Sequence, residues 1–276
     1  MRLKIAKLDP ETLKPGGVYV LQGRRSTGKS VLLKQLLYWM RDKHDLVIAM
    51  TPTESTREML CTMIPPSCVY DGFEVPVLEA IMDTQKELIA KGKVRWVCVV
   101  LDDCSYDARA WREKATGAAF RNSRHYNCTL ITTAQAVYDL PPSLRQQTDV
   151  LFALRDPIQQ SRKKLWLAYF GMMNFKDFVA AFEACTADFG AICLDQTVPT
   201  SDVTSCVFHT RANATVPAFR ACRDIYFKLA QTAHIKPHSK SNVEIITVPP
   251  QAKRMETIDE KGLLTPDPRR TMAVVR

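Results

Sequence analysis

The stretch "YVLQGRRSTGKSVLLKQLL" (residues 19–37) contains the pattern that decides the fold. Four of its residues, Gly23, Gly28, Lys29 and Ser30, fit G-x-x-x-x-G-K-[ST]. The apolar run "GGVYVL" ahead of the loop predicts a strand, and apolar residues at helical spacing over 30–44 predict a helix. Strand, loop and helix in this order are the context of a phosphate-binding loop, whereas the pattern alone also fits a glycine-containing turn before a helix.

The residue types in this loop suit a nucleotide triphosphate. Glycine lets backbone N–H groups approach phosphates closely, and the following helix adds the positive end of its dipole. Lys29 is expected to reach the β- and γ-phosphates, and Ser30 to bind Mg²⁺ through its hydroxyl. We therefore expect ATP and Mg²⁺ as ligands. The expected nucleotide-binding residues are Gly23, Arg24, Arg25, Ser26, Thr27, Gly28, Lys29, Ser30 and Val31.

The composition indicates a soluble globular protein. A chain of 276 residues with 46% hydrophobic and 24% charged residues holds one large domain or two small ones. We expect an intracellular protein, because no apolar stretch reaches the ~18–20 residues of a membrane span and the N-terminus lacks a signal-peptide core. Nine irregularly spaced cysteines without a C-x-x-C pair predict reduced, buried thiols. The net charge of +9 suits a polyanionic partner, although the basic tail contributes part of it.

Strand and helix patterns alternate along the first part of the chain. Near-continuous apolar strands are expected at residues 17–22, 45–52, 95–104, 128–135 and 148–156. Helices are expected at 30–44, 53–64, 75–93 and over most of 107–127. This alternation predicts an α/β fold with a mostly parallel central sheet of the RecA/ASCE type, covered by helices on both faces.

The second part of the chain adds fewer elements. Two helices (159–171 and 175–186), two strands (189–195 and 205–210) and a last helix (216–231) are expected. The predicted ATPase domain is thus residues 1–232. Residues 233–276 are polar, basic and Pro-rich, and we expect an extended tail that is flexible when alone.

The run "VCVVLDD" (residues 97–103) predicts a buried strand that delivers two acids to the phosphate side of the sheet. Asp102 is expected to hold Mg²⁺, directly or through water, and Asp103 to point toward an attacking water. Gln135, at the end of the next apolar strand, is expected to sense the γ-phosphate or orient water. The alternatives are helix-capping acids after a strand and a surface glutamine in a loop.

Phosphoryl transfer also needs positive charge at the leaving γ-phosphate, which an arginine finger supplies. Spacing alone does not choose among the candidates. They are Arg24 and Arg25 in the loop, Arg121 and Arg124 before the fourth strand, and Arg145 before the fifth.

Four stretches together, "GRRSTGKS", "VVLDD", "FRNSRHYNCTLITTAQ" and "LPPSLRQQTDVLFALRD", resemble the FtsK/HerA superfamily of P-loop ATPases. Within it, the chain is similar to the poxvirus-type DNA-packaging ATPases of nucleocytoplasmic large DNA viruses and of virophages. The "RHYN" stretch feeding a strand that ends in Gln, and the later "CLDQT" and "SCVFHTRA" stretches, narrow the resemblance. It covers roughly residues 14–212 and excludes the tail.

The resemblance implies a homo-oligomeric ring, pentameric or hexameric, that pumps double-stranded DNA into a capsid. In FtsK-like proteins a trans-acting arginine precedes the strand-end glutamine by about eleven residues, which is the position of Arg124 before Gln135. Arg145 is the second candidate, and Arg24 or Arg25 stays open because viral terminases use an arginine inside the loop. The resemblance also implies the host cytoplasm or the virion as location, with capsid-vertex or virion membrane proteins as candidate partners.

Other functions fit parts of the pattern. A nucleotide or small-molecule kinase shares the loop, and "DPIQQSRKK" could serve as its lid, although the paired acids and Gln135 suit hydrolysis better. A nucleotide-binding structural virion protein or a helicase-like cellular motor is also consistent with the loop. DNA-stimulated hydrolysis separates these functions from a packaging motor.

Overall fold

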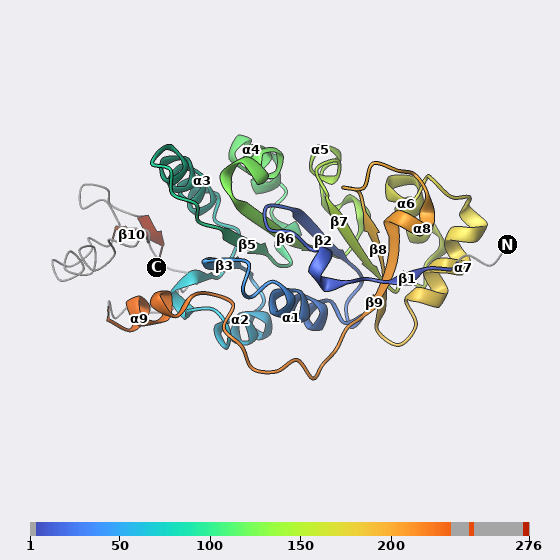
Figure 1. Ribbon diagram of the computed structural model, residues 1–276, viewed down its shortest axis with the longest axis horizontal. Helices are drawn as coiled ribbons and strands as arrows, with labels where there is room; N and C mark the ends of the chain where they lie inside the picture. The colour runs from blue at the N-terminus through green and yellow to red at the C-terminus, as the bar shows by residue number, and fades with distance from the viewer. Residues whose placement is uncertain (1–3, 233–242, 246–272, 276) are drawn as a thin grey trace.

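The computed structural model describes residues 4–232, 243–245 and 273–275, and a nine-stranded sheet runs through it (Figure 1). The strand order is β1-β9-β8-β7-β2-β6-β5-β3-β4. The strands are β1 (Ala6–Lys7), β2 (Val18–Gln22), β3 (Leu46–Met50), β4 (Val69–Tyr70), β5 (Val97–Leu101), β6 (Cys128–Ala134), β7 (Val150–Leu154), β8 (Gly190–Asp195) and β9 (Val207–Arg211).

Six neighbouring strands, from β7 through β2 to β4, are parallel. β8 is antiparallel to both β7 and β9, and β1 pairs in parallel with β9 at the edge. β6 lies between β2, which leads into the phosphate-binding loop, and β5, which leads into the paired acids. The predicted mostly parallel sheet of the RecA/ASCE type is therefore confirmed, with a small antiparallel extension at one side.

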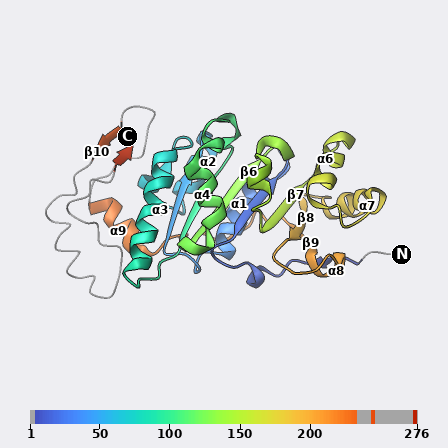
Figure 2. The same cartoon turned by 90° about the horizontal axis from the view of Figure 1, so that it is seen from above.

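Helices cover both faces of the sheet. Figure 1 shows α1, α2 and α9 below it and α3, α4 and α5 above, and Figure 2 shows the upper helices spread along its length from α3 to α7. The helices are α1 (Lys29–Trp39), α2 (Glu54–Cys61), α3 (Val75–Ala90), α4 (Lys114–Asn122), α5 (Pro142–Arg145), α6 (Gln159–Tyr169), α7 (Phe175–Cys185), α8 (Val203–Cys206) and α9 (Asp224–Thr232).

The two faces explain why the central strands are apolar throughout. In β5, Val97, Val99 and Leu101 join the core cluster under α3 and α4, whereas Cys98 and Val100 join the cluster under α1. Because successive side chains of a strand point to opposite faces, a strand covered on both faces has no polar side.

Helix α1 ends at Trp39, five residues earlier than expected. The chain then turns so that His44 enters the core, where its Nδ1 lies 3.3 Å from the Met40 carbonyl oxygen and its Nε2 lies 2.6 Å from Thr129 Oγ1. A carbonyl only accepts, so Nδ1 carries the proton and Nε2 accepts from the threonine hydroxyl. The predicted helix was too long because this contact on β6 is not visible in local periodicity.

The expected helix at 216–231 is wrong in its first half. Residues 216–223 form an extended strap that runs beneath α1 and α2, and only α9 is helical (Figure 1). The backbone N–H of Ala221 donates to Met63 O at 2.8 Å, and that of Arg223 donates to Asp45 O at 3.0 Å. These long-range bonds, with Ala221 and Cys222 buried in the lower core, replace the local bonds of a helix.

Two further elements differ from expectation. Only Lys114–Asn122 of the predicted helix over 107–127 is α-helical, and short 3-10 turns occupy much of the rest. The predicted tail contains β10 (Val243–Ile245) and β11 (Ala273–Val275), which pair antiparallel. The rest of the tail lies outside the described residues, so the division at residue 232 stays a prediction.

The nine cysteines, all within the described residues, are free thiols. Cys61, Cys68 and Cys185 are half-buried, and the other six are buried, as the prediction of buried thiols required for most of them. Within the described ranges, none of the helices combines the length and the apolarity needed to cross a bilayer.

Candidate functional site

The phosphate-binding loop connects β2 to α1 at the carboxyl edge of the parallel strands. At Gly23, an added Cβ would lie 2.7 Å from Thr27 Oγ1 and 2.8 Å from Leu154 Cβ, so no side chain fits. Gly28 has a φ of +98°, which favours glycine. Both glycines of the motif are thus required by the geometry of the loop itself.

Lys29 is half-buried at the start of α1. Its Nζ donates to Gly23 O at 2.5 Å and lies 3.4 Å from Arg24 O, so the side chain folds back over its own loop. Burial lowers the pKa of Lys29, and the nearby carboxylates of Asp103 and Asp102 oppose that shift. When a phosphate binds in the loop, its charged oxygens would replace the carbonyl oxygens as acceptors of hydrogen bonds from the Lys29 ammonium.

Asp102 follows β5 and is buried, with 4% of its surface exposed. Its Oδ1 accepts from Thr133 Oγ1 at 2.8 Å and its Oδ2 accepts from Thr51 Oγ1 at 3.1 Å. Burial raises the pKa of Asp102, and hydrogen bonds from Thr133, Thr51 and Thr56 partly offset the rise. The hydroxyls come from β6, the end of β3 and α2, so three elements orient one carboxylate.

Asp103 adopts the left-handed conformation, with φ 50° and ψ 33°. Its backbone N–H donates to Thr133 Oγ1 at 2.9 Å, and its Oδ1 accepts from Gln135 Nε2 at 2.9 Å. Thr133 therefore contacts both acids, since its hydroxyl donates to Asp102 and accepts from the Asp103 backbone. The structure brings Asp102, Asp103 and Gln135 together, as the sequence predicted.

Asp139 was not singled out from the sequence. Its Oδ2 accepts from the backbone N–H groups of Gln135 and Ala136, both at 2.8 Å, and its charge opposes the burial that lowers the pKa of Lys29. The bonds hold the turn after β6 and thereby the glutamine side chain. An acid four residues after a strand-end glutamine is the signal that could have identified it.

The donors present suit a hard cation. Ser30 supplies an exposed hydroxyl in the first turn of α1, and Asp102 supplies a carboxylate that its threonine partners hold in place. Mg²⁺ prefers oxygen ligands and usually keeps several waters beside one or two carboxylates and substrate phosphates. Among the described residues there is no group of three or more His, Cys, Asp or Glu side chains that could hold a metal ion.

The loop arginines lie at the same edge. Arg24 is 48% exposed, and its guanidinium lies 4.0 Å from Asp156 Oδ1 just beyond β7. Arg25 and Ser26 are exposed as well. Both arginines are exposed at the edge where a phosphate would bind.

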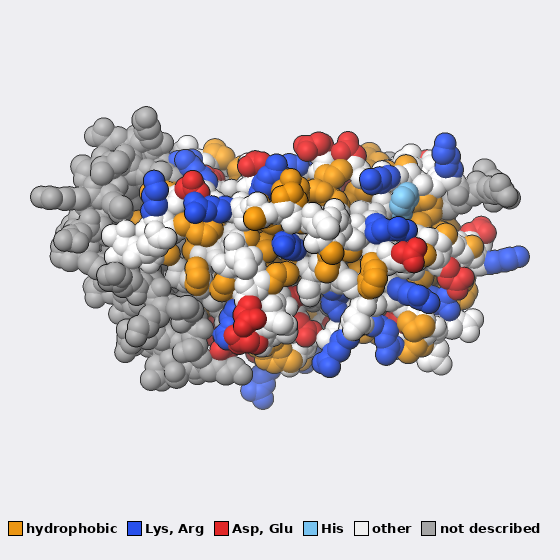
Figure 3. All heavy atoms as spheres, turned by 90° about the horizontal axis from the view of Figure 1, so that it is seen from below, with side chains coloured by type: hydrophobic (Ala, Val, Ile, Leu, Met, Phe, Trp, Pro, Cys, Tyr) orange, Lys and Arg blue, Asp and Glu red, His pale blue; other side chains and the backbone are white. Residues whose placement is uncertain are grey.

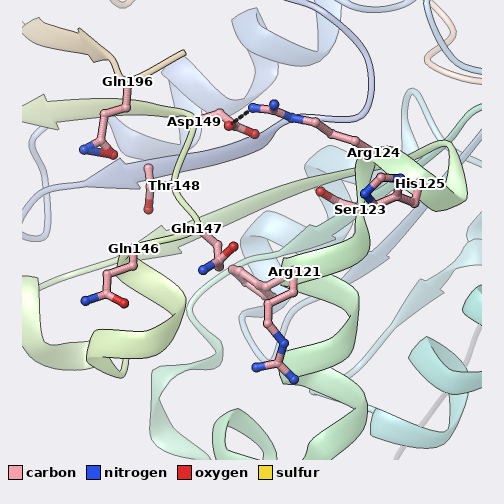
Figure 4. A pocket seen from close by; sticks show the side chains of 10 residues that line it. Arg121, Ser123, Arg124, His125, Gln146, Gln147, Thr148, Asp149 and Gln196 are labelled. Carbon is pink, nitrogen blue, oxygen red and sulfur yellow. Dashed lines mark hydrogen bonds and ion pairs between the residues drawn. The ribbon is translucent and has the colours of Figure 1, made fainter. Parts of the chain in front are cut away.

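Arg124 lies at the opposite, amino edge of the sheet, in the 3-10 turn η5 (Arg124–Tyr126) before β6. Its side chain is 62% exposed and forms an ion pair with Asp149, just before β7. Figure 4 shows both side chains at a pocket of about 490 Å³. Lining residues are Phe120, Arg121, Ser123, Arg124, His125, Gln146, Gln147, Thr148, Asp149 and Gln196.

Asp149 also accepts from the Val18 backbone N–H at 2.8 Å, at the start of β2. The sheet backbone therefore holds the carboxylate, and the carboxylate in turn pairs with the exposed guanidinium. Arg124 is at the surface and away from the loop of its own subunit, as a residue acting on a neighbour would be.

Arg145 is half-buried and bound to its own loop. Its guanidinium donates to Leu140 O at 2.7 Å and lies 4.8 Å from the Tyr138 ring centre. These contacts hold the segment after Gln135 in place. The Arg145 guanidinium is thus held by contacts within its own segment, and its role as the second candidate for a trans finger stays a prediction.

Comparison with known proteins finds similarity to viral sequences. It is 28% identical over 184 residues to uncharacterized protein 075L of Invertebrate iridescent virus 6, covering 65% of this chain and 70% of that protein. It is 26% identical over 236 residues to uncharacterized protein 015R of Frog virus 3, covering 84% of this chain and 73% of that protein. No protein-family model matches the chain.

Among solved structures, the genome-packaging NTPase B204 of Sulfolobus turreted icosahedral virus 2, in complex with AMPPCP, has a similar fold. The TM-score is 0.51 at 18% identity, over 72% of this chain and all of that one. The cytoplasmic domain of the type VII secretion ATPase EccC of Thermomonospora curvata has a TM-score of 0.50 at 14% identity, over 74% of this chain and 26% of that one. The predicted resemblance to packaging ATPases is confirmed at the level of the fold.

Proposed function

We propose that this chain is a viral genome-packaging ATPase, which hydrolyses ATP with Mg²⁺ and translocates double-stranded DNA into a capsid. One observation carries the proposal: Lys29, Asp102, Asp103 and Gln135 meet at the carboxyl edge of the sheet, beside a glycine loop built for phosphates. The fold likeness to B204 and the similarity to proteins of large DNA viruses support it.

Each residue has a distinct task in this proposal. The loop amides and Lys29 hold the phosphates, and Ser30 and Asp102 hold Mg²⁺, which neutralises developing charge on the phosphates when bound. Asp103 accepts a proton from the attacking water, and Gln135, bonded to Asp103, reports whether the γ-phosphate is present. Arg124 of a neighbouring subunit stabilises the transition state.

The partners follow from the charge and from the position of Arg124. A ring of five or six copies would bring the amino edge of one subunit against the loop of the next. Figure 3 shows Lys and Arg side chains scattered over the lower face instead of gathered in one stripe. Binding to phosphates is sequence-independent and weakens steeply with salt. The host cytoplasm and the virion are the proposed locations, and a capsid vertex protein is a proposed contact.

The segment that could serve as a kinase lid is packed within the domain. The segment "DPIQQSRKK" leads into α6, where Arg162 pairs with Glu183 on α7 at 2.5 Å. This packing holds the segment in the domain. A nucleotide-binding structural virion protein remains distinguishable by its slow hydrolysis.

The test is ATP hydrolysis with and without long double-stranded DNA, across protein concentration and salt. Wild type is compared with Lys29→Ala and with Lys34→Ala, which removes a lysine from the same helix outside the loop. We expect DNA to stimulate the rate, activity to rise more than linearly with protein concentration, and only Lys29→Ala to be inactive.

A rate that ignores DNA and stays proportional to protein concentration would contradict the motor, and an acceptor-dependent rate would favour a kinase. Nucleotide binding without measurable turnover under all conditions would favour the structural protein. EccC, a secretion ATPase, has a similar fold, so the fold alone does not identify a DNA motor. The proposed function therefore requires that DNA, and not polypeptide, stimulates the rate.

A further inference from the structure

The turn that enters β8 has an unusual conformation. Asp188 and Phe189 both have positive φ angles, 47° and 59°, and neither is glycine. Such a conformation is strained for a bulky residue and persists only where the surroundings impose it. Phe189 is in addition 61% exposed, so burial of the ring does not compensate for the strain. Strain together with an exposed aromatic ring points to a ligand.

The ring lies against the phosphate-binding loop. β8 is antiparallel to β7, with Ala191 opposite Leu154, so the turn before β8 lies at the carboxyl edge where the loop is. A Cβ placed on Gly28 would be 3.4 Å from Phe189 Cδ1 and 3.6 Å from Ala212 Cβ. Phe189 therefore flanks the second glycine of the motif, next to the first turn of α1.

Backbone contacts hold the turn in place. The Ala212 N–H donates to Phe189 O at 3.0 Å, and Arg211 lies 3.6 Å from the Asp188 carboxylate. One residue on, the Asn213 N–H donates to Gln35 Oε1 on α1 at 2.6 Å. The turn is thus connected to the helix that starts at the loop, while the ring itself stays free on its open side.

We propose that Phe189 is the platform on which the base of the bound nucleotide stacks. The inference rests on the proposed nucleotide site. The loop amides hold the α- and β-phosphates, so ribose and base extend from that end of the site, beside the start of α1. Stacking on an aromatic ring tolerates any base and contributes about 5- to 150-fold in affinity per base. Purine nucleotides, which offer the larger ring, bind more tightly than pyrimidine nucleotides here.

The test separates the base from the phosphates. Calorimetry with Mg²⁺ measures binding of AMPPCP and of inorganic tripolyphosphate to wild type, Phe189→Ala and Phe189→Trp. Leu167→Ala is the matched control, because Leu167 is 62% exposed on α6. We expect Phe189→Ala to weaken AMPPCP by about 5- to 150-fold and to leave tripolyphosphate unchanged. Phe189→Trp and Leu167→Ala should bind like wild type.

The outcomes distinguish this inference from the proposed function. Wild type that binds neither ligand contradicts the nucleotide site itself. Wild type that binds both, with Phe189→Ala unchanged, contradicts only the base platform. Equal losses for AMPPCP and tripolyphosphate would mean that the turn shapes the loop, and a smaller assembly with unchanged binding would make Phe189 an interface residue. Either result overturns the inference.

Discussion

The two edges of the central sheet differ in how complete they are. At the carboxyl edge, Asp102, Asp103 and Gln135 are joined through Thr133 and through one another. At the amino edge, Arg124 is exposed and has one ion-pair partner, Asp149. One edge is assembled within the subunit, and the other presents a cation outward.

Distance explains the difference. β6 has seven residues and joins the two edges, so at about 3.3 Å per residue they lie about 20 Å apart. Arg124 is therefore too far from its own loop to contact a phosphate bound there, which is why we propose that it acts on the loop of a neighbouring copy. Under the proposed function, the residues that bind the nucleotide and the arginine that assists hydrolysis would thus lie at opposite edges of the sheet.

Replacing Arg124 by Ala should have the largest effect on hydrolysis. We expect hydrolysis to fall by about 10³- to 10⁵-fold while nucleotide binding persists, because the lost charge acts on the transition state. Arg220→Ala is the matched control, since Arg220 is 58% exposed and also ion-paired on the surface. Steady-state ATPase assays and nucleotide titrations measure the two quantities.

Mixing tests the intersubunit part of this prediction. Subunits carrying Lys29→Ala and subunits carrying Arg124→Ala are inactive alone but supply each other's missing group in a mixed ring. Recovered activity in the mixture is the expected result. If the mixture stays inactive while the two variants assemble together, Arg124 does not act across the interface.

Asp103→Asn tests whether the carboxyl edge supplies the general base. The amide keeps an acceptor for Gln135 but does not take a proton, so we expect about a 10²- to 10⁴-fold lower turnover with little change in binding. Asp107→Asn, whose carboxylate caps a nearby turn, is the control. Turnover that stays within a few fold of wild type would exclude Asp103 as the base.

Thr133→Val tests whether the Thr133 hydroxyl stabilises the carboxyl edge. The hydroxyl bonds both acids from a buried position, and its loss leaves a buried carboxylate short of a donor, at a cost of about 1–3 kcal/mol of unfolding free energy. Thr132→Val removes a buried hydroxyl from the same strand that bonds only Leu101 O. Denaturant unfolding of both variants should show the larger loss, and a lower turnover, for Thr133→Val. Equal losses would mean that Thr133 has no special role.

His44 gives the amino edge a pH dependence. Burial lowers the pKa of His44 to about 4, whereas the unfolded chain has the ordinary value near 6.5. Between these pH values the histidine is protonated in the unfolded state and neutral in the folded state. The contribution of His44 to the free energy of unfolding is therefore fully present above pH 6.5 and decreases as the pH falls toward 4. The slope is at most about 1.4 kcal/mol per pH unit.

His44→Gln should flatten the slope in this window, and His125→Gln, at an exposed position, should not. Urea unfolding between pH 4 and 7 measures it. A slope that is unchanged in His44→Gln would show that the histidine is not responsible.

Much of the carboxyl edge could be predicted because its residues are tied to local patterns. The loop follows a strand and opens a helix, and the acids and Gln135 each end an apolar run. In a parallel sheet, strand ends meet at one edge, which brings these residues together. Asp139 was missed because it binds backbone N–H groups, and the one signal in the sequence, an acid four residues after a strand-end glutamine, does not by itself reveal such a contact.

The remaining features depend on which distant segments meet. Residues 216–223 read as a helix by periodicity, yet bonds to Met63 and Asp45 draw them into a strap. Arg145 looked like Arg124 in the sequence, since both precede strands, but its guanidinium bonds the carbonyl of Leu140.

The glycine loop, the succession of strands and helices, and the two acids that follow β5 are all visible in the sequence, because each depends on residues adjacent along the chain. Three contacts become visible only in the folded chain: Asp149 pairs with Arg124, Thr133 contacts both acids, and Phe189 flanks Gly28. The physical reason is that hydrogen bonds, ion pairs and ring contacts act over a few ångströms in space. Which side chains come that close is set by the packing of the whole sheet.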